Sequence, residues 1–185
     1  MGNNATQVVV GANGSVWVNA TLGANAPTNA TSALTGNWKE MGFISDEGAT
    51  FSEGKDITDI NAWQSFYPIR KLVTARTVQV SFALREWNRE SVQFALGGTV
   101  TGTAPGPYTY TPPAPETLAA KQLVLNWADG AKNYRLYIPS GIVSETVETT
   151  LARTAAADLP VTFAAQDPGG GNIYTLFTND PGFSS

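Results

Sequence analysis

The stretch that decides the fold is RTVQVSFALREWNRESVQFALGGTVT, residues 76–101. Its first half alternates apolar and polar side chains, which is the pattern of a strand with one buried face. The apolar positions are Val78, Val80, Phe82 and Leu84, and the opposite face carries Thr77, Gln79, Ser81 and Arg85. We therefore predict a half-buried strand that leads directly into the next element.

A short helix is predicted after this strand. Asn88 can accept a hydrogen bond from an unpaired N–H of the first turn, and Glu90 suits the positive end of the helix dipole. The apolar residues at the spacing of one helical face are Val92, Ala95 and Leu96. Gly97 and Gly98 end the helix, because glycine adopts the left-handed C′ conformation without steric cost. We expect this helix, at about 89–96, to lie across a sheet and to cover part of its apolar face.

The rest of the chain reads as strands separated by turns. The clearest hairpin turns at Asp129-Gly130 and pairs Leu123, Leu125 and Trp127 with Tyr134, Leu136 and Ile138. A second hairpin turn is predicted at Asp46-Glu47-Gly48. Other strands are expected at about 7–10, 16–22, 38–45, 140–154, 159–166 and 173–178, with a short strand or turn at 57–60 and long loops at 24–36 and 101–119. The fold class is mainly β, a β-sandwich or open barrel with one inserted helix, in a single domain over 1–185 in which 1–13 forms a polar arm.

The composition excludes several classes of function. The 185 residues include no cysteine and no histidine, so disulfides, zinc fingers and catalytic triads that need an imidazole are absent. Paired carboxylates remain, but each pair falls on a turn or strand surface, where solvated acids are the ordinary explanation. These pairs are Asp46/Glu47, Asp56/Asp59 and Glu145/Glu148. We expect no enzyme activity, no cofactor and no metal site.

The charge balance and hydropathy point away from nucleic-acid and membrane binding. The net charge is −4, and no basic stripe is present to neutralise phosphates. No apolar run approaches the length of a membrane span, and the N-terminus lacks the pattern of a secretory signal. Only 14% of the residues are charged, against roughly 25% in typical soluble domains. A weakly charged surface on a β-rich chain favours coverage by other subunits.

Four Asn residues begin N-x-S/T sequons within the first thirty residues. They are Asn4, Asn13, Asn19 and Asn29. Without a secretory signal, the favoured interpretation is that Asn and Thr serve in turns rather than as glycosylation sites.

An aromatic segment, NAWQSFYPIRKL at 61–72, resists assignment to a regular element because Pro68 interrupts it. Its Trp63, Phe66 and Tyr67 need cover from water. Two interpretations stay open from the residues alone. The aromatics could fold back as a local mini-core, or they could dock on a neighbouring molecule, since aromatic residues and Arg concentrate at interface centres.

Three segments together resemble the major tail tube protein of long-tailed, siphovirus-type phages, especially those of actinobacterial hosts. They are NWKEMGFISDEGATFSEGKDITDINAW, RTVQVSFALREWNRESVQFALGGTVT and QLVLNWADGAKNYRLYIPSGIVSETVETTLARTAAADLPVTFAA. The resemblance covers Val16 to about Gln166. It depends on the order of hairpin, aromatic loop, long strand, capped helix, Pro-rich loop and hairpin, and no single motif in it is chemically diagnostic.

The resemblance implies a β-sandwich-like subunit that forms hexameric rings, which stack into a tube. Strands of neighbouring subunits would join into a continuous inner barrel, and DNA would leave the capsid through it. In this family the loop between the two strands before the helix contacts neighbouring subunits. Here that loop maps to about 53–71, and the implied contact residues are Trp63, Gln64, Phe66, Tyr67, Arg70 and Lys71.

A lumen that conducts DNA should be acidic or neutral, so that like charge prevents phosphate contacts. The acidic total agrees with this expectation but does not place individual acids. The lumen candidates, chosen because they fall on predicted strands, are Glu40, Glu86, Glu145 and Glu148. An outer-surface solubility role is an equal alternative for each of them.

The resemblance also implies partners and a location. The partners are further copies of the chain, the tape-measure protein and DNA in the lumen, and the tail terminator and distal tail proteins, with no membrane. The location is the virion tail, assembled in the cytoplasm of the host bacterium. Two alternatives from other classes remain at this point. One is a tail-terminator or decoration protein that forms a single ring, and the other is a carbohydrate-binding adhesin.

Overall fold

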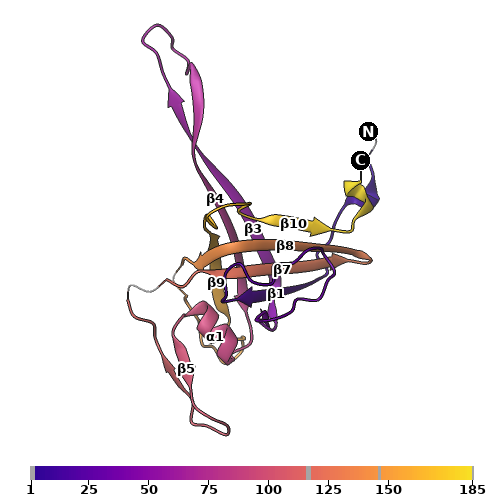
Figure 1. Cartoon of the computed structure of the whole chain (residues 1–185), viewed down its shortest axis with the longest axis vertical. Helices are drawn as coiled ribbons and strands as arrows, with labels where there is room; N and C mark the ends of the chain where they lie inside the picture. The colour runs from indigo at the N-terminus through magenta and orange to yellow at the C-terminus, as the bar shows by residue number, and fades with distance from the viewer. Residues whose placement is uncertain (1–2, 116–117, 146, 185) are drawn as a thin grey trace.

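The computed structural model describes residues 3–115, 118–145 and 147–184, and the fold is mainly β, as the sequence predicts. The main sheet has eight strands, in the order β2-β1-β7-β8-β9-β4-β3 with β10 beside β8, and all of its pairs are antiparallel. A separate hairpin, β5–β6, lies next to helix α1 (Figure 1). The elements are η1 (Ala5–Gln7), β1 (Asn13–Asn19), β2 (Lys39–Glu40), β3 (Ile44–Ile60), β4 (Arg70–Leu84), α1 (Arg89–Ala95), β5 (Thr99–Thr101), β6 (Thr109–Thr111), β7 (Lys121–Asp129), β8 (Lys132–Val143), β9 (Leu159–Ala165), β10 (Thr175–Thr178) and η2 (Pro181–Phe183).

The strand and helix in residues 76–101 form as predicted. The apolar positions of β4 from Val78 to Leu84 are all buried. Asn88 caps α1, because its side chain accepts a hydrogen bond from the Ser91 N–H at 2.9 Å. The Ser91 hydroxyl in turn accepts one from the Asn88 N–H at 3.0 Å, which completes a reciprocal capping box. Gly97 and Gly98 follow the helix with φ of 72° and 68°, so the predicted left-handed stop is confirmed.

Helix α1 closes the main core by covering the apolar face of the curved sheet. Phe94 is its central contact and is 3% exposed. Its ring stacks on Phe82 of β4 at a centroid distance of 6.2 Å and packs against Phe163 of β9 at 6.1 Å. Sequence analysis placed Val92, Ala95 and Leu96 on this face, and all three do pack there, but Phe94 contributes the largest ring.

The β7–β8 hairpin has the predicted register. Leu123 pairs with Ile138, Leu125 with Leu136, and Trp127 with Tyr134. Their side chains belong to the main core or pack against it. The apolar residues fix this register, because each of them lies opposite another on the buried face. A shift of the register by one residue would turn all the apolar side chains of one strand to the other face.

The predicted hairpin turn at Asp46-Glu47-Gly48 is wrong. These residues lie within β3, which continues to Ile60. The register moves from Ile44 opposite Leu84 to Ala49 opposite Phe82, so the extra residues form a bulge. Gly48, with φ of 76°, supplies the left-handed residue that such a bulge accommodates. A turn was predicted because the same residue types serve both purposes, and only the partner strand distinguishes them.

Other strand boundaries also differ from the prediction. The strand expected at 16–22 is β1, which spans Asn13–Asn19, and the one expected at 173–178 begins at Thr175. Residues 7–10 form no strand, since Gln7 ends the 3-10 helix η1 and no pairing follows. The strand expected at 38–45 is interrupted at 41–43, where Gly42 has φ of 77°. The strand expected over 140–154 ends at Val143. In each case the apolar or β-branched residues favour a strand locally, but the regular ladder does not continue. Single backbone bonds remain at the last two places, from the Met41 N–H to the Val16 carbonyl and from the Ser144 N–H to the Thr162 carbonyl.

The long loop at 20–37 is held against the outer face of the sheet by buried polar side chains. Arg135 is 6% exposed, and its guanidinium donates to the carbonyls of Asn29 at 3.0 Å and Ser32 at 2.8 Å. Gln122 is fully buried and donates to the Ala24 carbonyl at 3.0 Å. These bonds satisfy loop carbonyls that the loop itself does not pair.

Three of the four sequon asparagines serve in turns, as the favoured interpretation predicts. Asn4 accepts from the N–H of Thr6, Asn19 from that of Thr21, and Asn29 from that of Thr31. Asn19 is fully buried, so the folded chain cannot present it to a glycosylating enzyme. Asn13 begins strand β1 instead.

The two chain ends meet at the turn of the β7–β8 hairpin (Figure 1). The Lys132 ammonium donates to the Thr6 carbonyl and forms an ion pair with Asp180 at 3.3 Å. Asp180 is 7% exposed and also accepts a hydrogen bond from the Tyr134 hydroxyl at 2.5 Å. The predicted N-terminal arm is therefore attached to the subunit at a defined place, together with the C-terminal segment.

We predict that Phe94→Ala lowers the free energy of unfolding by about 3–5 kcal/mol, because it leaves a cavity between α1, β4 and β9. Phe94→Leu should cost less, and Arg89→Ala on the exposed side of the helix should cost about 0.5 kcal/mol or less. Urea denaturation of the three variants measures this. Equal losses for Phe94→Ala and Arg89→Ala would contradict the assignment of Phe94 to the core.

We predict a second effect at the chain ends that depends on pH. The hydrogen bond to Asp180 raises the pKa of Tyr134 to about 12, and the same bond lowers the pKa of Asp180. Because the folded pKa of Tyr134 lies above its ordinary value of about 10, its stabilisation is complete below that value and is lost as the pH rises through 12. The Asp180 contribution is present at neutral pH and is lost as the pH falls through its lowered pKa.

Unfolding of the wild type and Tyr134→Phe from pH 7 to pH 12 tests the alkaline limb. The wild type should be the more stable at pH 7, and the difference should shrink above about pH 10. A difference that stays constant over this range would contradict the coupling of Tyr134 to Asp180.

Candidate assembly surface

The most prominent feature of the surface is the β3–β4 hairpin, which runs out of the main sheet and ends far from the core (Figure 1). Strands β3 and β4 pair from Ile44 opposite Leu84 to Ile60 opposite Arg70. Strand β9 pairs only with residues 79–84 of β4. The nine residues 70–78 therefore extend past the neighbouring strand by about 30 Å, at about 3.3 Å per residue.

Both outer edges of this extension lack a strand partner within the described residues. β3 is the last strand of the sheet order, and β4 is covered on its other side by β9 only as far as Gln79. Unpaired N–H and C=O groups along such edges form a template for another strand. Few long edges of this kind are left open in proteins that stay monomeric.

The extension exposes apolar side chains on both of its faces. Residues 55–60 and 66–77 are all exposed. Directly opposed residues share a face of the hairpin, so Ile57 with Val73 and Leu72 with Thr58 lie on opposite faces. The exposed fractions of the large aliphatic side chains are 57% for Ile57, 41% for Ile60, 45% for Leu72 and 45% for Val73.

The tip of the hairpin, defined as residues 61–69, is aromatic and uncharged. Trp63 and Phe66 are fully exposed, and Tyr67 is 81% exposed. The Ser65 hydroxyl holds the loop, since it donates to the Tyr67 carbonyl at 2.8 Å and accepts from the Tyr67 N–H at 3.1 Å. The rings therefore do not form the local mini-core that sequence analysis kept open.

The six predicted contact residues fall on two elements. Trp63, Gln64, Phe66 and Tyr67 lie on the tip, whereas Arg70 and Lys71 begin strand β4. Lys71 forms an ion pair with Asp59 across the hairpin at 2.7 Å. The loop predicted over 61–72 is thus shorter than expected, because β4 begins soon after Pro68.

The exposed aliphatic residues of the hairpin are not predicted by the sequence as a surface patch. The signal that could have found them is the presence of large aliphatic residues on both sides of the tip, Ile57 and Ile60 before it and Leu72 and Val73 after it. They do not alternate with polar residues, because both faces of the hairpin carry them and because the pairing skips Thr74 between Ala75 and Val73.

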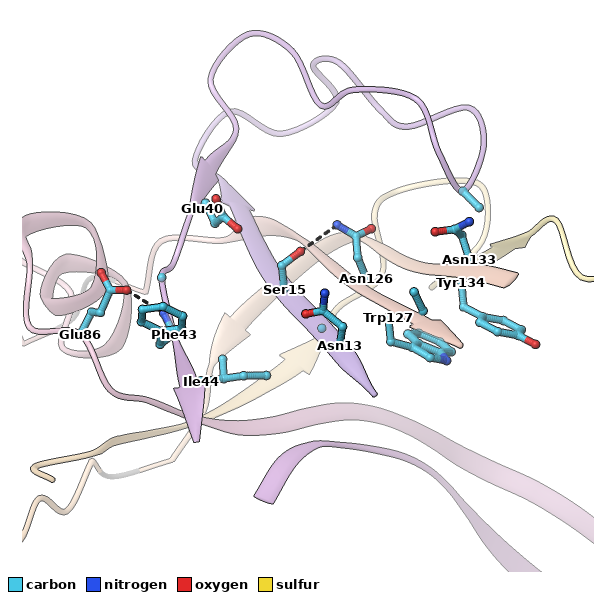
Figure 2. A pocket seen from close by; sticks show the side chains of 14 residues that line it. Asn13, Ser15, Glu40, Phe43, Ile44, Glu86, Asn126, Trp127, Asn133 and Tyr134 are labelled. Atoms are coloured by element: carbon cyan, nitrogen blue, oxygen red, sulfur yellow. Dashed lines mark hydrogen bonds between the residues drawn. The ribbon is translucent and has the colours of Figure 1, made fainter. Parts of the chain in front are cut away.

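Two of the four candidate lumen acids line one hollow of about 600 Å³ beside β1 and β7. Figure 2 shows Glu40 and Glu86 on the side of the hollow that is formed by residues 40–44. Glu40 is exposed on β2. The rest of the lining combines small and polar residues with the aromatic side chains of Phe43, Trp127 and Tyr134, and of these Phe43 is 76% exposed.

Glu86 has a structural role in this hollow. It lies beyond the end of β4 rather than on a strand. Its carboxylate accepts hydrogen bonds from the Phe43 N–H at 2.9 Å and from the Asn88 side chain at 3.4 Å (Figure 2 shows the first). It also occupies the space beside Gly42, where a Cβ would lie 2.4 Å from the carboxyl carbon. Glu86 thus joins the break before β3 to the cap of α1.

The other two acids lie elsewhere and also off the strands. Glu145 and Glu148 follow the end of β8 and are exposed. The Glu145 carboxylate accepts a hydrogen bond from the Thr162 hydroxyl at 2.8 Å. The prediction that all four acids sit on strands is therefore wrong for three of them. The four acids do not share one hollow, and their assignment to a lumen stays a prediction.

The described residues offer little for catalysis. They contain no cluster of three or more Asp, Glu, His or Cys side chains that could hold a metal ion. Within 3–115, 118–145 and 147–184, no helix combines the length and apolar character needed to cross a membrane. The hollows are open and lined by structural side chains, so the hairpin is the surface feature that needs an explanation.

A mainly β subunit with a long projecting hairpin and an uncharged aromatic tip has the features of a structural component of an assembly. Over residues 1–185 the sequence matches the family described as phage tail tube protein, and the chain belongs to this family. No curated protein matches the chain. The protein is a structural part of a phage virion and not an enzyme. The terminator, decoration and adhesin alternatives are not favoured by this match.

We predict that Glu86→Ala lowers the free energy of unfolding by about 0.5–1.5 kcal/mol, because the exposed Phe43 N–H exchanges its protein acceptor for water. Glu86→Gln keeps a carbonyl acceptor of nearly the same shape and should cost clearly less. Thermal or urea unfolding of both variants is the measurement. If neither Glu86→Ala nor Glu86→Gln changed the free energy of unfolding, the structural role would be refuted. The charge of Glu86 in a lumen would then be the remaining role for this residue.

Proposed function

We propose that the protein polymerises through the β3–β4 hairpin into hexameric rings, and that these rings stack into the tail tube through which DNA passes from the capsid into the host. The single observation that carries the proposal is the extension of β3 and β4 beyond the sheet, with open edges and exposed apolar side chains. The membership of the chain in the tail tube family supports it.

The open edges of the β3–β4 hairpin favour pairing with other copies. A two-stranded hairpin is only marginally stable by itself in water, and three or more strands are needed for independent stability. Neighbouring copies would supply the missing strands. When every copy joins its hairpin to the next, the strands close into a barrel, and closure removes all exposed edges.

The charges on the projecting hairpin nearly balance. The Asp59–Lys71 pair at 2.7 Å and the Glu53–Arg76 pair at 3.9 Å each join an acid to a base across it. Over residues 53–77 the remaining charged side chains are Lys55, Asp56 and Arg70, so the net charge is +1. Acids from other parts of the subunit would have to offset this excess for the duplex to slide without binding the wall. Glu40, Glu86, Glu145 and Glu148 stay candidates for lumen acids, and Glu86 is the weakest because its carboxylate is already bonded.

The finer features of the assembly follow from the same proposal. The tube would surround the tape-measure protein before DNA enters it, and it would end at a tail terminator and at distal tail proteins. The resemblance of the sequence suggests a siphovirus-type tail of a phage with an actinobacterial host, assembled in the cytoplasm of that host. The N-terminal segment 1–13 would add a subunit contact.

Negative-stain electron microscopy over a protein concentration series tests the proposal. Hollow tubes of uniform diameter with a regular axial repeat and six-fold symmetry support it. Closed rings that never stack at any concentration would overturn the tube and restore the terminator alternative. Specific glycan binding by a protein that never assembles would restore the adhesin.

We predict that Trp63→Ala combined with Phe66→Ala abolishes tubes without unfolding the subunit. Both side chains are fully exposed in the single chain, so the stability of the monomer should change by about 0.5 kcal/mol or less. Interface anchors of this type typically cost about 2 kcal/mol or more each when truncated. Leu151→Ala, which removes a side chain that is 79% exposed elsewhere, is the matched control and should still form tubes.

A further inference from the structure

The molecule carries a second apolar feature at the end opposite to the tip. A hollow of about 490 Å³ lies between α1, the β5–β6 hairpin and the end of β8. We call it the α1 groove, and its apolar lining includes Phe94, Leu96, Pro113, Leu118 and Val143. In Figure 1 the tip of the β3–β4 hairpin and the elements of the α1 groove occupy opposite ends of the long axis.

We infer that the aromatic tip of one copy, residues 61–69, seats in the α1 groove of a second copy. This inference rests on the proposed assembly of the protein and names the surface that receives the tip. A groove of this size falls within the range of about 300–1,000 Å³ found for sites that bind drug-sized ligands. It is therefore large enough for an indole or phenyl ring.

The shape of the α1 groove is fixed by the two glycines after α1. At Gly98 a Cβ would lie 2.2 Å from the Thr111 carbonyl oxygen, and at Gly97 it would lie 3.1 Å from Pro113. Both glycines have positive φ, so the chain leaves the helix end and returns close against residues 111–113. This close approach forms the groove wall, and a side chain at Gly98 would displace it.

The charges at both surfaces permit burial of aromatic rings. The tip carries no charged residue, so no charge on it is desolvated when it docks. Two charged side chains line the α1 groove, Lys121 and Glu145. Glu145 is exposed, and its carboxylate accepts a hydrogen bond from the Thr162 hydroxyl at 2.8 Å. The Lys121 ammonium already donates to the Gln93 carbonyl at 3.2 Å and lies 5.1 Å from the centre of the Phe94 ring. An inserted ring therefore does not deprive Lys121 of its partners.

The area involved fits a contact that repeats within a polymer. Three aromatic side chains bury about 150–250 Å² each, so the tip supplies about 500 Å² and the pair of surfaces about 1,000 Å². This total is at the lower limit for a specific interface, and one such contact is weak. Because the tip and the α1 groove lie on different parts of the chain, the contact is heterologous and can repeat from copy to copy.

Cysteine cross-linking tests the inference directly, because the chain has no native cysteine. Gln64→Cys places a thiol on the tip and keeps all three rings, and Thr99→Cys places one on the exposed wall of the α1 groove. The two single variants are mixed and treated with a short bismaleimide. Asn13→Cys, exposed in the hollow beside β1, replaces Thr99→Cys in the matched control.

We expect the 64–99 product to exceed the 64–13 product by about tenfold or more, since a seated tip holds the two thiols at about millimolar effective concentration. Mass spectrometry of the linked peptides identifies the product. Trp63→Ala in the Gln64→Cys chain should reduce the 64–99 yield to the control level. That result would tie the cross-link to the aromatic contact rather than to random collision.

The outcomes separate this inference from the proposed function. If tubes form but the yield of the 64–99 product does not exceed that of the 64–13 product, the docking of the tip in the α1 groove is refuted and the proposed tube is still supported. A 64–99 excess from a protein that forms no tubes supports the groove and overturns the tube. The absence of both tubes and the 64–99 product overturns the two together.

Discussion

The structure depends on one constraint, the antiparallel pairing of β3 with β4 beyond the point where the sheet supports it. Over the proximal half, β9 and α1 hold β4 in place through the buried positions Val80, Phe82 and Leu84. Over the distal half, the described residues supply no third strand and no core behind the backbone bonds that join the two strands. Such a ribbon exposes its edges and both faces to water, and this cost is recovered only when a neighbour covers them.

The body of the subunit is built to hold that ribbon at a fixed angle. Phe94 joins the helix to β4 and β9, and Glu86 joins the helix cap to the residues that precede β3. Both strands of the hairpin are thus anchored at their base by the same short helix. This arrangement explains why a two-turn helix is present in an otherwise β chain, and the same helix forms one wall of the α1 groove.

The sequence predicts the parts of this fold that depend on local rules. The alternation at 78–84, the Asn88 cap and the register of Trp127 with Tyr134 all follow from side-chain periodicity and turn chemistry. The bulge at Asp46–Gly48 could not be predicted, because a glycine-containing turn and a bulge use the same residues and differ only in the partner strand. The hydrogen bonds of Glu86 could not be predicted either. Its carboxylate accepts from the Phe43 N–H and the Asn88 side chain, and only the tertiary structure brings Phe43 close to it.

The attachment of both chain ends to Lys132 has a mechanical consequence. A pull on the N-terminal segment is transmitted through the Thr6 carbonyl, and a pull on the C-terminal segment through Asp180, so both loads reach the same turn between β7 and β8. From there the force runs along two strands that are paired over their length in the centre of the sheet. Tension on either end is therefore passed to the central β7–β8 pair, away from the β3–β4 hairpin that reaches the neighbours.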